Sequence, residues 1–470
     1  MRTLRWATAA LLLGGFLAGT AIAQTGTALR LQQPASVLQT GYETSNAGYA
    51  VADNQQPGTP AVSPSNQPPP PPTAAATPAT PATPAATDQT ACEEPCDADK
   101  PFKLFQNEWL TEKNIDIRGW VDAGFTWNTD NPHPKYNDPV GYNDRSNELG
   151  MNQLYLICER ATKTDGCGID VGGRVDMLYG TDYRYPKVTT GTEFDSEWST
   201  GLYGLAMPQA YGDLAINDLI IRGGHFLAPV GYESVMSAEN FFYSHTYSFL
   251  YGQPTTFTGG ELIYKINDRI TCNGGMYSGG WNDFDASNGK VGCFGGMAWN
   301  SEDGKTTLTL ESTMGNNQAP GVTSTRAYFN VVLTRKLGDK WQYAFEGNYA
   351  TETHESLATH PTALGKFYDL ANYMFYTIND CWKVGLRYEY FSDEDGVVLT
   401  TTADGAPTVP GHYSDLGLGL NWKPNATLTV RSEIRWDWAD GSPFAAGAHP
   451  FDEGKKDQQF LLGTDAIVRF

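Results

Sequence analysis

Side chains that could catalyse a reaction are scattered through the 470-residue chain. The seven histidines, at positions 133, 225, 245, 354, 360, 412 and 449, fall mostly in polar connecting segments, and the sequence contains neither a GxSxG nor an HExxH motif. Cys92 and Cys96 form a CxxxC pair without histidines nearby, which favours a local disulfide or two free thiols over a metal site. We therefore expect no catalytic site, no metal and no cofactor.

A larger set of charged residues follows a regular pattern, because its members recur at every second position of extended segments. In Ile115–Trp127 the odd positions are mostly apolar, while Asp116, Arg118 and Asp122 occupy even positions, and Thr427–Trp438 repeats the arrangement. Such alternation predicts β-strands with one apolar and one polar face. The charged residues of the polar faces, which we predict to line an aqueous interior, are Asp116, Arg118, Asp122, Asp170, Arg174, Asp176, Arg222, Glu261, Lys265, Arg387, Glu389, Arg431, Glu433 and Arg435.

The lengths of the alternating segments and of their connections indicate which solvent the apolar face meets. Ile115–Trp127 is longer than a soluble strand of about 5–6 residues and long enough for a tilted membrane strand of about 9–11. Short turns such as Asn217–Asp218 alternate with long polar loops such as Asn128–Glu148. Seven short and eight long connections predict an all-β transmembrane antiparallel β-barrel of about 16 strands (14–18), with both termini on the side of the short turns.

Aromatic residues gather near the ends of these segments, where a membrane strand would cross the lipid headgroup region. Some lie beside short turns, and others lie where strands enter long loops. The residues that we predict to form two aromatic girdles are Trp127, Tyr179, Trp299, Trp341, Tyr349, Trp382, Tyr390, Trp422 and Trp438. The alternative, that the rings fill the core of a soluble sandwich, fits any single strand but fits the whole series less well.

The N-terminal residues differ in composition from the barrel segments. Residues 1–23 combine Arg2 and Arg5 with an apolar run and an Ala21–Ala23 cleavage site, which predicts an export signal peptide. Residues 24–113 are rich in Pro, Ala and Thr as far as about Lys100 and end in a short pre-barrel segment, so we predict a disordered periplasmic linker. The barrel then occupies residues 114–470. The net charge of −21 argues against nucleic-acid binding.

One segment carries a family resemblance. The sequence RGGHFLAPVGYE, from Arg222 to Glu233, resembles the Gly-x-Phe-x-x-Pro-x-Gly-x-Glu segment of the putative β-barrel porin-2 family. The matching residues are Gly224, Phe226, Pro229, Gly231 and Glu233. Similar order and spacing downstream, at Asn240–Ser244, Gln253–Pro254 and Gly279–Asn282, extend the resemblance over roughly residues 114–470. The resemblance implies an outer-membrane barrel and a pore, and says less about the solute.

The cysteines depart from the family pattern. Cys158 and Cys167 flank a short turn, and Cys272 and Cys293 lie on adjacent predicted strands, so each pair is a candidate disulfide. Cys381 has no obvious partner in the sequence.

A closed barrel of this size encloses water, so we expect passive diffusion of small hydrophilic solutes or ions across the outer membrane. Two alternatives remain: a structural or adhesive outer-membrane barrel without an open pore, and an outer-membrane enzyme. Residues 101–470 carry 46 acidic and 28 basic side chains, a net charge of −18 that favours cations if much of it faces the channel. The alternative is that the acidic excess lies on the loop tips and binds divalent cations between surface polysaccharides. The apolar stretch NFFYSHTYSFLYG in the connection Leu227–Thr258 is expected either to fold into the barrel as a constriction or to pack between subunits.

The expected partners follow from this location. They are outer-membrane lipid and the barrel assembly machinery, which would recognise the last strand, ending at Phe470. A homotrimer and a contact between the N-terminal tail and the cell wall are further candidates.

Overall fold

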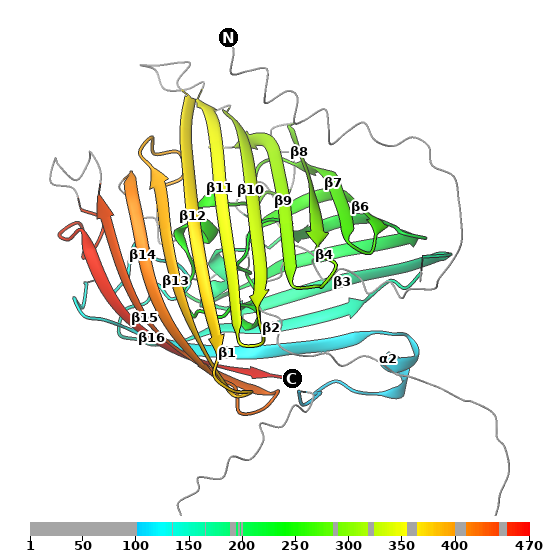
Figure 1. Cartoon of the computed structure of the whole chain (residues 1–470), viewed down its shortest axis with the longest axis horizontal. Helices are drawn as coiled ribbons and strands as arrows, with labels where there is room; N and C mark the ends of the chain where they lie inside the picture. Colours follow the sequence, from blue (N-terminus) through cyan, green and yellow to red (C-terminus); the bar gives the residue numbers. More distant parts are fainter. Residues whose placement is uncertain are drawn as a thin grey trace, which may run out of the picture. The chain divides into compact units, whose positions relative to one another are not determined.

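The computed structural model describes residues 101–470 except 134, 165, 189–193, 196–197, 199–200, 285–289, 318–323, 355–363, 400–409 and 441–448. The predicted signal peptide and most of the predicted linker lie outside the described residues. Sixteen strands of the described chain form a closed antiparallel barrel (Figure 1), which confirms the predicted fold class. They are β1 (Asp116–Asn128), β2 (Leu149–Arg160), β3 (Ile169–Gly180), β4 (Gly204–Ile216), β5 (Leu219–Leu227), β6 (Thr256–Asn267), β7 (Ile270–Ser278), β8 (Val291–Asn300), β9 (Thr306–Asn317), β10 (Ser324–Leu337), β11 (Trp341–His354), β12 (Leu364–Thr377), β13 (Trp382–Asp393), β14 (Gly411–Trp422), β15 (Leu428–Asp440) and β16 (Gln458–Arg469).

Each strand pairs with its neighbours in sequence, and the first strand pairs with the last. β1 lies antiparallel to β16, with Trp120 opposite Arg469. Just beyond this ladder the Phe470 amide donates to the Gly119 carbonyl, and the Gly119 amide donates to the Phe470 carbonyl, both at 2.9 Å. Closure matters because lipid offers no hydrogen-bond partner to an open strand edge.

The connections alternate between the two rims as predicted, although their lengths differ less than expected. The β4–β5 turn is Asn217–Asp218, and Asn217 has a φ of 54°, a left-handed conformation that Asn tolerates better than most residues. The β9–β10 loop covers only residues 318–323, whereas the β2–β3 turn covers 161–168. The reason is that β9 and β10 continue further toward the loop rim than the alternation of their residues suggested.

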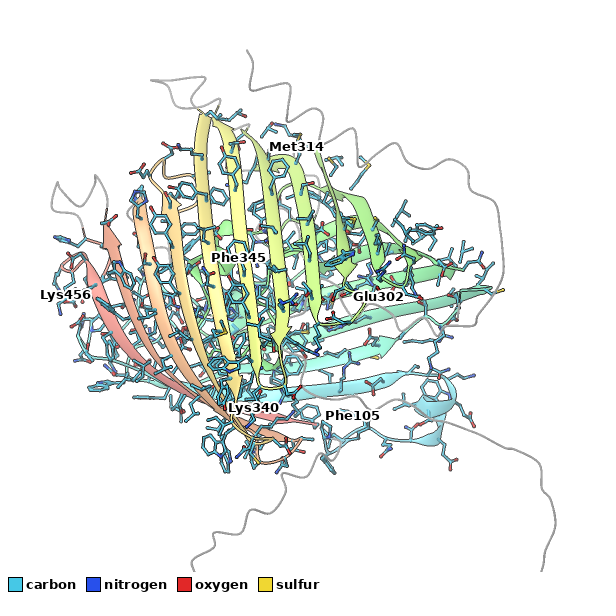
Figure 2. The ribbon with its side chains drawn as sticks, viewed as in Figure 1. Phe105, Glu302, Met314, Lys340, Phe345 and Lys456 are labelled. Carbon is cyan, nitrogen blue, oxygen red and sulfur yellow. The ribbon has the colours of Figure 1, made fainter. Side chains whose placement is uncertain are left out.

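A short helix precedes the barrel, within the predicted pre-barrel segment. Helix α2 (Glu108–Glu112) begins after Asn107, whose side-chain oxygen accepts a hydrogen bond from the Leu110 amide at 2.9 Å. The Phe105 ring (labelled in Figure 2) lies 6.5 Å from the Phe470 ring, centroid to centroid, so this segment lies at the short-turn rim. Within the described residues, no helix combines the length and the apolar character needed to cross a membrane.

The outward side chains of the strands are apolar and exposed. On the paired strands β14 and β15, Leu418 lies opposite Ile434, and 48% and 42% of these residues are exposed. Gly417 and Glu433, their neighbours in sequence, face inward and are buried. An apolar outer face around a closed barrel is what contact with lipid requires.

Substituting Leu418 with arginine is expected to lower the free energy of unfolding by about 2–4 kcal/mol, because it places a charge on the lipid face near the middle of the strand. Val430→Arg, near the short-turn end of β15, should cost only about 0–1 kcal/mol. Denaturant titration of the protein folded in lipid vesicles measures both values. Equal losses at the two positions would argue against a lipid-facing surface.

The structure corrects the predicted disulfides, because it has free cysteines at Cys158, Cys167, Cys272 and Cys293. On β7 and β8, Cys272 pairs with Met297 and Cys293 with Met276, so the two cysteines are four positions out of register. Cys158 lies within β2, whereas Cys167 lies in the turn that follows. Both predicted pairings are therefore wrong, since spacing in sequence does not determine strand register. Cys381, between β12 and β13, is disulfide-bonded.

Candidate functional site: the barrel interior and its inserted loop

The connection between β5 and β6, residues 228–255, folds into the barrel, and we call it the inserted loop. It contains two short helical turns, η2 (Ser237–Glu239) and η3 (Ser248–Gly252). Its buried Phe and Tyr residues are Tyr232, Phe241, Phe242, Tyr243, Tyr247 and Phe249. Of the two expectations for this apolar stretch, folding into the barrel is confirmed, because these rings pack inside the barrel.

The residues that carry the family resemblance lead the chain from β5 into the inserted loop. Phe226 is buried at the end of β5, where its ring centroid lies 6.2 Å from that of Phe294. Gly224 and Gly231 have φ values of 140° and 84°, which side chains with a Cβ rarely adopt. Pro229 follows, on the wall of a cavity described below. These residues therefore set the direction in which the chain turns inward.

Glu233, the last residue of this motif, joins the inserted loop to the barrel wall. Its carboxylate accepts hydrogen bonds from the Thr246 amide and the Tyr373 hydroxyl, both at 3.0 Å. It also lies 3.0 Å from His245 Nδ1 and 3.4 Å from Arg387 Nη1. Burial raises the pKa of this carboxyl, but the hydrogen bond with His245 and the charge of Arg387 outweigh burial and lower the pKa to about 2. Glu233 is therefore ionised at neutral pH.

Arg431 on β15 holds the first part of the inserted loop. Its Nη1 donates to the carbonyl oxygens of Ser237, Asn240 and Phe242 at 2.9, 2.9 and 3.0 Å. Its Nε donates to the Asp465 carboxylate of β16 at 3.0 Å. One wall side chain thus satisfies three loop carbonyls while its own charge is paired.

Two further arginines hold the second part of the loop. Arg387 Nη1 on β13 donates to the Ser244 carbonyl at 2.8 Å, and Arg435 on β15 donates to the His245 carbonyl. Both guanidinium groups contact Asp415 of β14, at 3.0 Å from Arg387 Nε and 3.7 Å from Arg435 Nη2. This charge cluster is buried, so its members depend on one another for compensation.

Carboxylates of the wall bind the loop amides in the same region. Glu389 accepts hydrogen bonds from the amides of Tyr247 and Ser248, both at 2.7 Å, and Glu433 accepts one from the Ser244 amide at 2.9 Å. A loop inside a barrel has no strand ladder to satisfy its backbone, and buried backbone groups need partners. The charged side chains of β13 and β15 provide them.

Glycines of the wall make room for the loop rings. A Cβ built at Gly419 of β14 would lie 2.8 Å from the Phe241 ring and 3.0 Å from the Phe242 ring, and one at Gly463 of β16 would lie 3.0 Å from the Tyr243 ring. Real Cβ atoms essentially never come within 3.0 Å of another group, and a contact at 3.0 Å is already unusually tight, so a side chain at either position would force the rings to shift. The wall from β13 to β16 is therefore shaped to the inserted loop.

Several residues predicted to line water instead contact the inserted loop. Five of them are buried, with no more than 5% of the residue exposed: Arg387, Glu389, Arg431, Glu433 and Arg435. They face the interior as predicted, but the loop covers them, which corrects their predicted environment. Asp122 is also buried, 3.6 Å from Arg431 Nη2, and Asp176 is buried with the Tyr155 hydroxyl donating to it at 2.7 Å.

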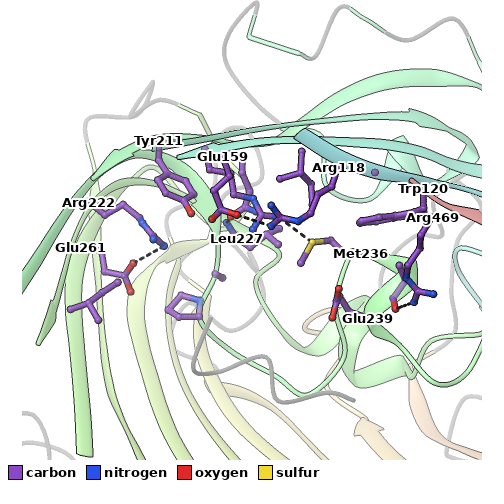
Figure 3. A pocket seen from close by; sticks show the side chains of 18 of the residues that line it. Arg118, Trp120, Glu159, Tyr211, Arg222, Leu227, Met236, Glu239, Glu261 and Arg469 are labelled. Atoms are coloured by element: carbon purple, nitrogen blue, oxygen red, sulfur yellow. Dashed lines mark hydrogen bonds and ion pairs between the residues drawn. The ribbon is translucent and has the colours of Figure 1, made fainter. Parts of the chain in front are cut away.

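The opposite part of the wall borders an open space. A cavity of about 300 Å³, which we call the side cavity, lies between the inward faces of β1–β8 and the inserted loop (Figure 3). Four of the predicted interior residues line it: Arg118, Arg174, Arg222 and Glu261. Phe470 also lines it, which places the cavity on the short-turn side. Its volume is in the range of small-molecule sites.

Other predicted residues lie closer to the lipid or to the rims. Three residues of the predicted interior set are partly exposed near the short-turn rim: Asp116, Asp170 and Lys265. The predicted girdle residues lie on the outer face. Figure 2 labels Lys340, just before β11 at the short-turn rim, and Phe345 further along this strand. Trp341 and Tyr349 of the same strand are 48% and 47% exposed.

Some cavity residues were missed from the sequence, among them Glu159, Tyr211 and Arg469. Glu159 lies near the end of β2, in a segment where apolar and polar residues alternate poorly. Its register opposite Arg174 would have identified it, but register is not visible in one sequence. In the described part of the chain, no group of three His, Cys, Asp or Glu side chains is placed to hold a metal.

Comparison with known proteins agrees with this geometry. The model of the family described as putative beta-barrel porin-2, OmpL-like, matches residues 114–470. An anion-selective porin from Comamonas acidovorans is similar in structure, with a TM-score of 0.53 and 11% identity over 76% of this chain and 99% of that one. OprB of Pseudomonas putida has a TM-score of 0.50 and 11% identity over 77% of this chain and 96% of the other. No curated protein sequence matches the chain.

A closed sixteen-stranded barrel with an apolar outer face and a loop folded inside defines an outer-membrane barrel of the porin class. The chain belongs to the putative β-barrel porin-2, OmpL-like family. The two solved structures, at this low identity, support the fold.

Proposed function

We propose that the protein is a channel for the passive diffusion of small hydrophilic solutes and ions through the outer membrane. The division of the barrel interior into two parts carries the proposal. Buried ion pairs and hydrogen bonds fix the inserted loop to β13–β16, whereas β1–β8 present polar side chains to the side cavity. Solutes would cross beside the loop, along β1–β8. Polar wall groups replace the hydrogen bonds that a solute loses with water, so no reaction is needed.

The proposal includes an orientation. Outer-membrane barrels have short turns on the periplasmic side, so the rim at which β1 begins and β16 ends would face the periplasm. Residues 1–23 would direct export and residues 24–113 would form a periplasmic linker, in contact with the cell wall. Phe470 at this rim would be available to the barrel assembly machinery, and three copies would associate through their outer faces.

A structural or adhesive barrel without an open pore is the second candidate, and one observation favours it. On the long-loop side, Val140, Leu399 and Phe451 come from three different loops and pack in one buried cluster with Phe391 and Tyr413 of the strands. Close apolar packing of this kind excludes water. If these loops stay closed in the membrane, solutes would not reach the side cavity from outside.

Recording from the purified full-length protein in planar lipid bilayers tests the channel. We expect stepwise conductance from protein that migrates as a folded barrel on unheated gels. We also expect a weak cation preference in the reversal potential, because residues 101–470 carry a net charge of −18. The preference should weaken as salt rises, since screening shortens the reach of these charges. Folded protein without conductance would favour the structural barrel, and an anion preference would contradict the expected selectivity.

A further inference from the structure

Charged residues of both signs line the side cavity. They are Arg118 on β1, Glu159 on β2, Arg174 on β3, Arg222 on β5 and Glu261 on β6, together with Glu239 of the inserted loop and Arg469 of β16. Register places Glu159 opposite Arg174, and Arg222 opposite Glu261. Figure 3 shows Arg118, Glu159, Arg222 and Glu261 pointing from the wall into the same space. The wall therefore alternates between hydrogen-bond donors and acceptors.

Each of the three arginines on β1, β3 and β5 already has a carboxylate partner, and the fourth, Arg469, donates to the Thr429 hydroxyl and the Ala238 carbonyl. Arg118 Nη2 lies 2.6 Å from Glu159 Oε2, and Arg222 lies 3.0 Å from Asp213 through Nε and 3.6 Å from Glu261 through Nη1. Arg174 Nε lies 2.7 Å from the carboxylate of Asp176, on the same strand. The field of the guanidinium groups on β1, β3 and β5 is therefore largely cancelled. A small ion of either sign would gain little attraction unless it displaced one of these partners.

The paired groups still have unused hydrogen-bonding capacity. A guanidinium has five N–H donors and a carboxylate has roughly four acceptor positions, more than one ion pair uses. Gln209 and Asn273 add side-chain amides to the same wall. A hydroxyl group both donates and accepts, so it fits a wall on which donors and acceptors alternate.

The opposite wall of the cavity is mainly apolar, with one carboxylate, that of Glu239. It is formed by the inserted loop, through Ala228, Pro229, Met236 and Ala238. A ligand that contacts both walls needs hydroxyl groups along one edge and an apolar C–H surface on the other. A simple inorganic ion or a short dicarboxylate lacks the second feature.

We propose that the side cavity binds a neutral, hydroxyl-rich solute of the size of a small sugar or polyol. Its hydroxyl groups bind the charged wall of β1–β6, and its C–H surface contacts the inserted loop. This inference rests on the proposed channel function and names the class of solute that the channel selects.

Two measurements on the full-length protein test the site. Calorimetric titration in detergent should show saturable binding of glucose and sorbitol, with at least about tenfold weaker binding of succinate and lysine. In planar bilayers, glucose should reduce the ion current in a saturable way. Saturable binding of succinate or lysine with none of glucose would overturn the inference.

Variants of the charged wall sharpen the test. Glu159→Gln and Arg222→Gln should each raise the Kd for glucose about tenfold, because each weakens a charge-assisted hydrogen bond. Glu159→Gln should also strengthen succinate binding, since Arg118 loses one of its two partner carboxylates and keeps only Asp116, at 2.9 Å. Arg160→Gln is the matched control: it breaks an ion pair to Asp170 of similar length, 3.0 Å, outside the cavity lining, and should leave glucose binding unchanged.

The outcomes separate the two proposals. Ion conductance without glucose binding would overturn the solute site and leave the channel standing. Glucose binding that the two wall variants do not weaken would also overturn it, because the ligand would then lie elsewhere. Glucose binding without conductance in any salt would overturn the channel and leave the site standing.

Discussion

Replacing Arg431 with methionine is expected to lower the free energy of unfolding by about 3–5 kcal/mol, the usual cost of removing one partner of a buried ion pair. The change leaves the Asp465 carboxylate without its cation. It also leaves the loop carbonyls of Ser237, Asn240 and Phe242 without their donor. Methionine keeps most of the side-chain volume, so the effect reports on charge and hydrogen bonding. Denaturant titration, followed by the gel shift between folded and unfolded barrel, measures it.

Arg335→Met on β10 is the matched control. Arg335 also projects from a strand, but it is exposed, and it donates to one neutral hydroxyl, that of Thr306, at 2.7 Å. Its loss should change stability by only about 0.5 kcal/mol. Similar losses in the two variants would mean that the inserted loop is not held by Arg431.

Replacing residues 232–250 with a short Gly/Ser linker is expected to raise the single-channel conductance several-fold. The barrel has the strand number at which an unfilled interior forms an aqueous channel, and this segment fills the part of the interior next to β13–β16. The charges of β13 and β15 would then meet water, and hydration would replace the hydrogen bonds that they make to the loop. Planar-bilayer recording measures the conductance.

The deletion needs a control for folding, because it removes the partners of several buried side chains. Far-UV circular dichroism and migration on unheated gels should show an intact barrel. An intact barrel with unchanged conductance would mean that the inserted loop does not limit passage. The packed long-loop rim around Phe451 and Leu399 would then be the restriction.

Much of the fold could be predicted because it depends on local patterns. Whether a residue faces lipid or the interior follows from its position along a strand, as Ile434 and Glu433 show: the first is exposed on the outer face and the second is buried inside. Strand number and the alternation of rims follow from the same period-two pattern and from the turn residues between segments. The period-two pattern is least regular in the segment that forms β2, which contains Glu159.

The two cysteine pairs show that local patterns do not predict strand register. The positions of Cys272 and Cys293 on neighbouring strands were predicted, but their offset of four positions was not. Register depends on how whole strands pair and on where turns begin, and one sequence contains no direct signal for it.

The sequence by itself determined the barrel, its lipid-facing surface and the set of charged residues that point inward. Only the tertiary structure decided which of those residues bind the inserted loop and which line the side cavity. Arg431 and Arg222 look alike in the sequence, each a basic residue on the polar face of a strand. Arg431 binds the carbonyl of Phe242 in the inserted loop, which lies 189 residues earlier in the chain. Arg222, in contrast, borders the side cavity. The physical reason is that the path of residues 228–255 decides which wall charges are covered, and that path depends on contacts between residues far apart in the chain.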